Sequence, residues 1–177
     1  MTLKSTPLNH VIQDLGFEQK FGRAPHIGKD SETDRIVAHL EHVCKTLESS
    51  HLATISGRAQ MIQLLKQYIT EAQFPSQFDY KSSNGETRVP CFIDDKGVHC
   101  AAGYLMKHSG FAQLAQDLNS NFRFNYVHEM LATQQDASNA NIFSELNRFL
   151  QESNLTALEV ATIQPTYDCT YLLYFCK

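Results

Sequence analysis

The sequence has no run of apolar residues long enough to cross a membrane. A spanning helix needs about 18 or more consecutive apolar residues. The opening residues, MTLKSTPLNHVIQDLGF, contain no apolar stretch before a small-residue cleavage site. We therefore expect a cytoplasmic protein without a transmembrane segment. The alternative is secretion or export by a route without a visible N-terminal signal, or an export signal that was removed from the chain.

Positive charge is also scarce. Fifteen Lys and Arg residues stand against 19 Asp and Glu residues, which leaves a formal net charge of -4 at pH 7. Because the chain as a whole has no positive field to hold phosphate backbones, we expect no nucleic-acid partner. The 177 residues, 42% of them hydrophobic, suit one soluble domain that buries its own core.

Paired cysteines and the common catalytic signatures are missing. The five cysteines are odd in number and contain no CxxC spacing, so we expect reduced thiols and no disulfide that folding requires. The sequence also has no glycine-rich phosphate loop, no GxSxG and no HExxH, and it indicates no cofactor. The cysteines are Cys44, Cys91, Cys100, Cys169 and Cys176.

One predicted helix carries three residues that zinc would accept, His39, His42 and Cys44. A zinc site needs about four ligands in a tetrahedral arrangement, and no second His/Cys pair follows at ligand spacing. We therefore expect no metal site. We interpret the two histidines as solvated surface residues.

Helical periodicity fills most of the chain. Caps and apolar residues at helical spacing predict a helix over residues 7–15, one from Ser31 to about residue 47, and one from Ser56 to before Pro75. Several further helical segments follow from Cys100 onward. We expect a mainly α fold, a single-domain helical bundle.

The domain organisation expected from these segments is simple. Residues 1–30 form an N-terminal helix and an irregular arm, and residues 31–177 form a single helical domain. In the last part of that domain, Thr156 and Glu159 make a capping box for a helix that Pro165 ends.

β-type residues occur in one place, ETRVPCFI, and the turn DDKG follows them. This pattern predicts one short β-hairpin over about residues 88–99. Pro90 keeps the hairpin away from a sheet interior, and Gly97 stands where a turn commonly requires positive φ. The next helix then starts at about Cys100 and ends at Gly110.

Cys100 is the candidate nucleophile. A thiol in the first turn of a helix lies near unpaired backbone N–H groups and the positive end of the helix dipole, which favour the nucleophilic thiolate. His128 is a candidate base, and Asp94 could orient it. The competing interpretation, which we favour, is that Cys100 is a small buried core residue.

Arg88, His99 and Tyr104 are the candidate binding residues. Arg88 could clamp a carboxylate or phosphate with two hydrogen bonds. It could equally pair with Glu86, Asp94 or Asp95 and fix the turn, and we favour this structural role because carboxylates are close in sequence. His99 adjoins Cys100, but neighbours on a strand point to opposite faces.

The stretches HLEHVCKTL, QFPSQF, RVPCFIDDKGVHCAAGYLMKHSGFAQLA and SNLTALEVATIQPTY resemble a family of uncharacterised bacterial proteins. That family carries R-x-P-x-F-x-D-x-x-G-x-x-C-A, then Y-L-x-x-x-S-G, then L-T-x-x-E-x-A-x-I-Q-P-x-Y. The resemblance covers roughly residues 34–167. The matching positions in the central stretch are Arg88, Pro90, Phe92, Asp94, Gly97, Cys100, Ala101, Tyr104, Leu105, Ser109 and Gly110.

The resemblance implies no activity, cofactor or substrate, because none is known for that family. The family pattern includes Cys100 but neither Cys91 nor His99. It therefore argues against a Cys91–Cys100 disulfide and a His99 base as general features. Many members start with an export signal that this chain lacks, which leaves localisation open.

Two classes of function remain. The first is a non-enzymatic module that binds a protein partner or a small ligand, as a bacterial accessory or effector-type protein. The second is a cysteine-dependent hydrolase or transferase centred on Cys100. We favour the first, because the sequence fixes no base beside the thiol.

Overall fold

The computed structural model describes residues 7–26, 29–76, 88–133 and 137–168. Within these ranges the fold is mainly α-helical, as expected, and it contains one two-stranded antiparallel sheet. The elements are α1 (Leu15–Phe21), α2 (Glu32–Glu48), α3 (Ser56–Glu71), β1 (Arg88–Pro90), α4 (Ala101–His108), α5 (Ala112–Phe122), α6 (Val127–Ala132), the 3-10 turn η1 (Ala137–Asn139), α7 (Ala140–Ser153), α8 (Ala157–Ile163) and β2 (Thr166–Asp168).

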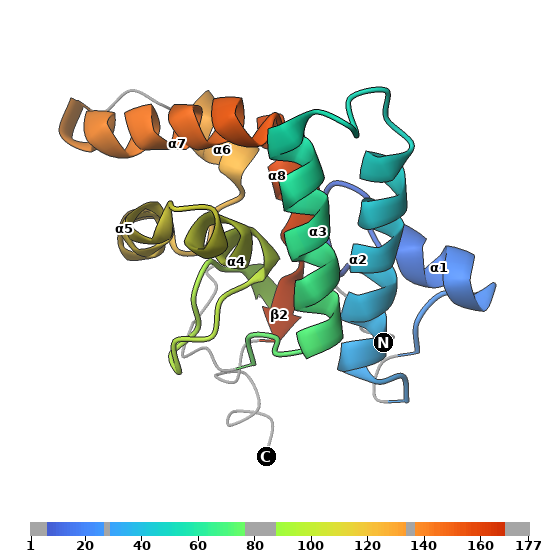
Figure 1. The fold of residues 1–177 in the computed structure, drawn as a ribbon. Helices are drawn as coiled ribbons and strands as arrows, with labels where there is room; N and C mark the ends of the chain where they lie inside the picture. The colour runs from blue at the N-terminus through green and yellow to red at the C-terminus, as the bar shows by residue number, and fades with distance from the viewer. Residues whose placement is uncertain (1–6, 27–28, 77–87, 134–136, 169–177) are drawn as a thin grey trace, which may run out of the picture.

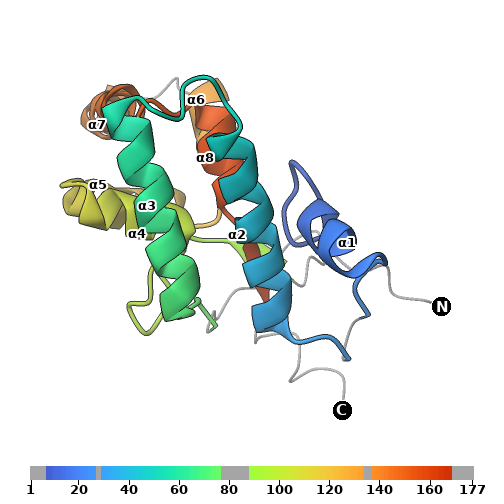
Figure 2. The same ribbon diagram turned by 45° about the vertical axis from the view of Figure 1, so that its right-hand side comes forward.

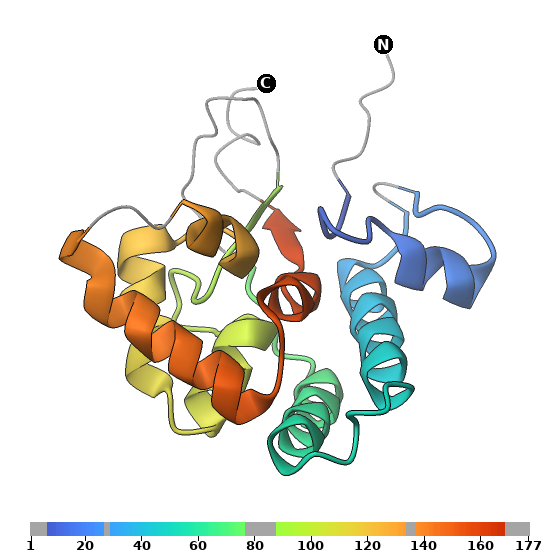
Figure 3. The same cartoon turned by 90° about the horizontal axis from the view of Figure 1, so that it is seen from above.

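The helices pack around α8 and α4. Helices α2 and α3 lie side by side, and α1 packs against α2 (Figures 1 and 2). Helix α7 packs against α3 and α5, near the start of α3. Seen from above, α8 lies in the middle, where it contacts α2, α4 and α6 (Figure 3).

Local signals place several helix ends where the sequence predicts them. The Ser31 side chain accepts the backbone N–H of Asp34 and caps α2. At the start of α8, Thr156 and Glu159 bond each other's backbone N–H groups in the predicted capping box.

The first predicted helix, over residues 7–15, is wrong. The Asn9 side-chain oxygen accepts the backbone N–H groups of Val11 and Ile12, so a turn forms there, and α1 begins only at Leu15. Gly16, which was expected to end that helix, lies inside α1. A Cβ there would be 2.7 Å from the Ala38 carbonyl oxygen, so glycine lets α1 pack closely on α2.

Strand β1 finds its partner at the far end of the chain. It pairs antiparallel with β2, with Arg88 opposite Asp168 and Pro90 opposite Thr166. Within residues 88–99 the expected hairpin is present as one antiparallel bridge between Ile93 and His99.

The turn inside that bridge has the expected geometry. The Asp94 N–H donates to the Val98 carbonyl (2.9 Å) and the Cys100 N–H donates to the Phe92 carbonyl (2.9 Å). Gly97 has the predicted positive φ of 81°. The turn therefore leads directly into the start of α4.

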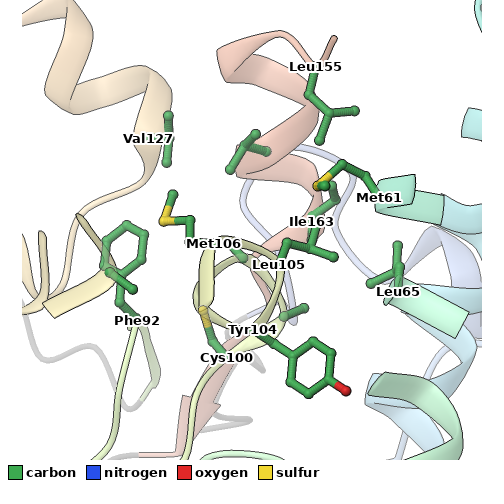
Figure 4. Packing of buried hydrophobic residues seen from close by; sticks show 14 of the residues in the cluster. Met61, Leu65, Phe92, Cys100, Tyr104, Leu105, Met106, Val127, Leu155 and Ile163 are labelled. Atoms are coloured by element: carbon green, nitrogen blue, oxygen red, sulfur yellow. The ribbon is translucent and has the colours of Figure 1, made fainter. Parts of the chain in front are cut away.

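Helix α4 is the centre of the core. Its residues Ala101–Met106 are all buried. Met106 lies toward Phe92 and Val127, while Leu105 lies toward Ile163 and the α3 side chains (Figure 4). Burial of this apolar surface positions the start of the helix, and with it Cys100.

Candidate functional site

Cys100 is the N-cap residue of α4. Its sulfur accepts the backbone N–H of Gly103 at 3.4 Å, so the thiol does satisfy the helix N-terminus, as the sequence suggested. The residue is 0% exposed and lies inside the core (Figure 4). A Cβ at Gly103 would be 2.6 Å from the Phe92 carbonyl oxygen, which shows how closely the preceding turn packs on α4.

A second buried thiol precedes the turn that leads to Cys100. Cys91 is also 0% exposed, and the carbonyl of the next residue, Phe92, accepts the Cys100 N–H at 2.9 Å. Burial in the apolar core raises the pKa of Cys91 well above its usual value, and the nearby Cys100 raises it further. Both cysteines are free, as is Cys44; Cys169 and Cys176 lie outside the described residues.

The Asp94 side chain stabilises the turn that precedes α4. One carboxylate oxygen accepts the backbone N–H groups of Lys96 (2.9 Å) and Val98 (2.8 Å), and the other accepts that of Ser76 (3.1 Å). Three N–H donors therefore hold a carboxylate that is only 5% exposed. Its role here is to fix the loop that precedes α4.

His128 lies on α6 with different neighbours. Its ring is 5.9 Å from the ring of Tyr126, measured between centroids. Among the contacts of the described residues, none joins the His128 ring to the Cys100 sulfur or to the Asp94 carboxylate. The three candidate catalytic residues thus keep separate partners.

His99 and Tyr104, in contrast, share a neighbour, Tyr68, although the Tyr104 side chain is itself buried at 7% exposure. The Tyr68 hydroxyl donates to the His99 carbonyl (2.9 Å), and its ring packs 4.9 Å from the Tyr104 ring. The Tyr104 hydroxyl donates to Glu71 Oε1 at 2.8 Å, and the exposed His108 ring stacks on Tyr104 at 4.2 Å.

We call this surface the Tyr104 face and define it by five residues: Glu71, His99, Tyr104, Lys107 and His108. The sequence prediction included His99 and Tyr104 but missed the other three. Helical spacing could have found two of them, since Lys107 and His108 lie three and four residues after Tyr104 on α4.

The Tyr104 face carries one lysine, Lys107, one carboxylate, Glu71, and two histidines. Burial lowers the pKa of His99, and the nearby Lys107 and His108 lower it further. Hydrogen bonds from Gln67 and Tyr104 lower the pKa of Glu71. Burial and the Glu71 contact raise the pKa of Tyr104 to about 12, so its hydroxyl keeps its proton.

Arg88 is buried, and its guanidinium forms several hydrogen bonds within the protein. Its guanidinium donates to Glu32 Oε2 (3.1 Å), Asp168 Oδ1 (2.7 Å) and both the hydroxyl (3.0 Å) and carbonyl (2.7 Å) of Thr166. The structural role is thus present, but not with the expected partners. Asp94 and Asp95 pair elsewhere, and residue 86 lies outside the described residues.

The interpretation of His39 as a surface residue is wrong. His39 is 1% exposed, and its Nε2 bonds the Thr162 carbonyl of α8 at 2.8 Å. His42 is only partly exposed and bonds Gln19 at 2.9 Å. In the part of the chain that the structure describes, no three His, Cys, Asp or Glu side chains converge as metal ligands.

Two surface hollows lie away from α4. The larger, of about 420 Å³, is lined by Gln19, His42, Lys45, Thr46, Ser49 and Ser50. The smaller, of about 260 Å³, is lined by Glu48, Ala53, Ala59, Ile62 and Gln63. Neither contains a residue that the sequence predicted for catalysis or binding, although His42 was considered as a zinc ligand.

Comparison of the chain with protein-family models, with curated proteins and with solved structures finds no match. None of the described helices combines the length and the apolar character that a bilayer span requires. Function therefore has to be argued from the geometry above.

Proposed function

We propose that this protein is a binding module whose Tyr104 face recognises an acidic segment of a protein partner. One observation carries the proposal: the residues around Cys100 divide between a sealed core and an accessible surface. Cys100 itself is 0% exposed, whereas His99 is partly exposed and Lys107 and His108 are exposed.

The make-up of the Tyr104 face favours a protein partner. Aromatic side chains held in fixed positions are typical anchors of protein interfaces. Here Tyr104 is held by Tyr68 on one side and by Glu71 through its hydroxyl. Small-molecule sites are usually enclosed and mostly apolar. The larger hollow is lined by polar residues, and both hollows lie away from the Tyr104 face.

The charge of the Tyr104 face favours an acidic segment. Lys107 is exposed, and burial and the positive charge of Lys107 both lower the pKa of His99. The one acidic residue, Glu71, is engaged by Gln67 and Tyr104. A surface of this kind attracts carboxylates and disfavours basic partners, even though the whole chain is negative at -4.

The alternative function, a hydrolase or transferase with Cys100 as nucleophile, requires a substrate to reach that sulfur. Its exposed fraction of 0% and the separate partners of His128 and Asp94 weigh against it. A binding module does not require the Cys100 sulfur to be accessible.

We further propose that the module acts in the cytoplasm of a bacterium as an accessory or effector-type protein and does not bind nucleic acid. Three buried free cysteines suit a reducing compartment. The net charge of -4 disfavours phosphate backbones.

A peptide selection tests the binding function. We expect peptides displayed on phage and selected on the immobilised protein to be enriched in Asp and Glu. Lys107→Glu should weaken the affinity of a selected peptide by at least about tenfold in fluorescence anisotropy, because it places like charges in contact. Lys45→Glu is the matched control, since Lys45 is exposed in the last turn of α2 as Lys107 is in α4.

Two outcomes would contradict the proposal. One is enrichment of neutral or basic peptides. The other is an equal loss of affinity in Lys107→Glu and Lys45→Glu. In the same assay Cys100→Ser, whose hydroxyl can replace the thiol as the helix cap, should bind as the parent does; loss of binding by a folded Cys100→Ser protein would favour the enzyme.

A further inference from the structure

We propose that the C-terminal end of α8 is a peptide-binding site, which residues 7–12 of this chain occupy and which a Leu-Asn segment of a partner protein takes in their place. We call residues 7–12 the resident segment. The inference goes beyond the Tyr104 face and does not depend on it. It rests on the contacts of the resident segment, which are those of a bound peptide: main-chain hydrogen bonds and two buried side chains.

Backbone groups of the resident segment bond the walls of the site. The Leu8 carbonyl accepts the N–H (2.5 Å) and the hydroxyl (2.9 Å) of Thr166, the first residue of β2. The His10 N–H donates to the hydroxyl of Tyr126, the N-cap residue of α6, at 3.1 Å. Every peptide has such backbone groups, so these bonds give affinity without selecting a sequence.

Two side chains of the resident segment determine which sequence fits. Leu8 is 0% exposed and packs in the hydrophobic core, so the corresponding residue of a partner has to be apolar. Asn9 is also 0% exposed, and its amide nitrogen donates to three carbonyls at the end of α8. These carbonyls belong to Ala161 (2.9 Å), Thr162 (3.2 Å) and Gln164 (2.7 Å).

Asparagine is the residue that these three acceptors select. A carbonyl oxygen can only accept hydrogen bonds, so the group of carbonyls needs a donor and disfavours the carboxylate of an aspartate. The Asn9 oxygen, on the other side of the amide, accepts the N–H groups of Val11 (2.7 Å) and Ile12 (3.0 Å). The same side chain thus binds the site and gives the segment its turn. A fitting partner therefore has asparagine directly after an apolar residue.

The site is held in place by groups outside the resident segment. His39 of α2 bonds the Thr162 carbonyl at 2.8 Å. The Arg88 guanidinium bonds the hydroxyl (3.0 Å) and the carbonyl (2.7 Å) of Thr166, and β2 is paired with β1. Departure of the resident segment therefore leaves the α8 carbonyls and Thr166 in position for a partner segment.

Two features make the resident segment replaceable. Gln13, directly after it, has a φ of 57°, a left-handed conformation that residues with a side chain rarely adopt. Gln164 is 0% exposed, and its Nε2 has no hydrogen-bond partner among the described residues, although its carbonyl accepts the Asn9 amide. A partner segment that avoids the strained bend and offers a carbonyl to Gln164 therefore binds more tightly than the resident segment alone.

Release of the resident segment does not require α1 to leave its place. Asp14, which precedes α1, accepts two hydrogen bonds from the Arg35 guanidinium of α2, at 2.7 and 2.8 Å. Within α1, Lys20 pairs with Glu41 of α2 at 2.8 Å. Asp14 therefore marks the point up to which the N-terminal part of the chain moves when a partner binds.

A labelled peptide with the sequence of residues 7–14, PLNHVIQD, tests the site in the full-length chain. The parent presents its own resident segment at a high effective concentration, against which the free peptide competes poorly. Asn9→Ala weakens the resident segment but leaves the groups of the site unchanged. His10→Ala is the matched control, because His10 is exposed and bonds the site through its backbone N–H.

We expect PLNHVIQD to bind the folded Asn9→Ala chain at least about tenfold more tightly than the parent or His10→Ala in fluorescence anisotropy, because the competition within the chain is reduced. The peptide PLAHVIQD, which lacks the asparagine, should bind Asn9→Ala at least about tenfold more weakly than PLNHVIQD does. Bound PLNHVIQD should also slow hydrogen exchange of the Thr166 amide, because the leucine carbonyl of the peptide accepts that N–H.

Equal affinity of PLNHVIQD for the three chains, or of the two peptides for Asn9→Ala, would overturn the proposal, as would a folded Asn9→Ala chain without detectable binding. Hydrogen exchange in the parent decides the matter even if Asn9→Ala fails to fold. The Thr166 amide has to exchange faster than the α4 amides, through local opening of the resident segment. Equal rates would show that this segment leaves only on global unfolding, and the proposal would be wrong.

Analytical ultracentrifugation separates a partner protein from a second copy of this chain. A monomeric parent supports a separate partner as the source of the Leu-Asn segment. If the parent dimerises and Asn9→Ala abolishes the dimer, the occupant is the resident segment of a second copy. That result would overturn the proposal of a separate partner.

Discussion

At the scale of single residues, two glycines are required for different physical reasons. Gly97 has a φ of 81°, and a Cβ at this position would meet open space. Glycine is therefore favoured here by the backbone conformation and not by packing. Gly57 has no such constraint, but a Cβ there would be 1.9 Å from the Glu152 carbonyl oxygen of α7. The requirement for glycine at position 97 is local to a turn, whereas the requirement at position 57 comes from a helix far along the chain.

Substitution of Gly97 should therefore cost stability through the backbone alone. We expect Gly97→Val to lower the free energy of unfolding by about 1 to 3 kcal/mol, because a β-branched residue resists positive φ. Gly97→Asn is the matched control and should cost clearly less, since asparagine tolerates this region. Urea denaturation measures both. Equal stability of the two variants would mean that the turn relaxes to another conformation.

At the scale of elements, the end of α8 is held by side chains from distant segments. The Asn9 amide donates to the carbonyls of Ala161 (2.9 Å) and Gln164 (2.7 Å). His39 of α2 bonds the Thr162 carbonyl. These contacts satisfy carbonyl groups that every helix leaves unpaired at its C-terminus. They hold the N-terminal segment and α2 against α8.

His39 makes this junction sensitive to pH. Because a carbonyl can only accept, Nε2 carries the proton in the neutral ring, and Nδ1 is buried without a hydrogen-bond partner among the described residues. Burial, with smaller effects of His42 and Arg35, lowers the pKa of His39 from 6.5 to about 4. The folded state therefore disfavours the protonated ring.

The sign of the pH effect follows from this pKa. Between pH 6.5 and about 4 the unfolded chain binds a proton at His39 that the folded chain does not. The stabilisation is complete above pH 6.5 and is lost as the pH falls toward 4, a difference on the order of 3 kcal/mol. In urea denaturation, His39→Gln should lose less stability than the parent over this range. Parallel curves for parent and His39→Gln would show that His39 does not titrate in this way.

The elements also show which parts of the fold and site the sequence could predict. The caps at Ser31, Thr156 and Cys100 act on N–H groups three residues away, so a short stretch of sequence contains both partners. The partners of Arg88 and the carbonyls that accept from the Asn9 amide lie more than 50 residues away. Local patterns cannot reveal such pairs, and for this reason the strand pairing was not predicted. The first helix was mispredicted for a local reason, because the Asn9 oxygen accepts the N–H groups of Val11 and Ile12 and forms a turn.

The candidate site likewise combines features that local sequence predicts with features that depend on distant segments. The thiol of Cys100 was placed correctly at a helix N-terminus from local signals, but its complete burial depends on how the preceding turn packs on α4. Tyr104 was identified, whereas Glu71 joins it from another helix, α3. The electrostatic contacts of the Tyr104 face therefore could not be predicted from the sequence.

At the scale of the whole molecule, Arg88 joins segments from both ends of the chain. It bonds Glu32 at the start of α2 and Asp168 and Thr166 of β2, and its own residue lies in β1. The Thr166 hydroxyl in turn donates to the Leu8 carbonyl at 2.9 Å. One buried guanidinium thus connects the N-terminal segment, α2 and both strands.

Loss of this guanidinium should weaken the whole fold. Arg88→Met keeps much of the apolar stem but removes the donors to the hydroxyl and carbonyl of Thr166, which is 0% exposed. Leaving a buried polar group without its partner costs about 1 to 3 kcal/mol, whereas Glu32 and Asp168 are exposed enough to be solvated when the guanidinium is lost. Arg148→Met is the matched control, because Arg148 pairs with Glu145 while 54% exposed, and exposed pairs contribute little. We expect a large fall in the urea midpoint for Arg88→Met, with an unchanged slope if unfolding stays cooperative, and nearly the parent midpoint for Arg148→Met. Similar midpoints for the two variants would show that the segments are held together without Arg88, by the Asn9 contacts and the apolar core.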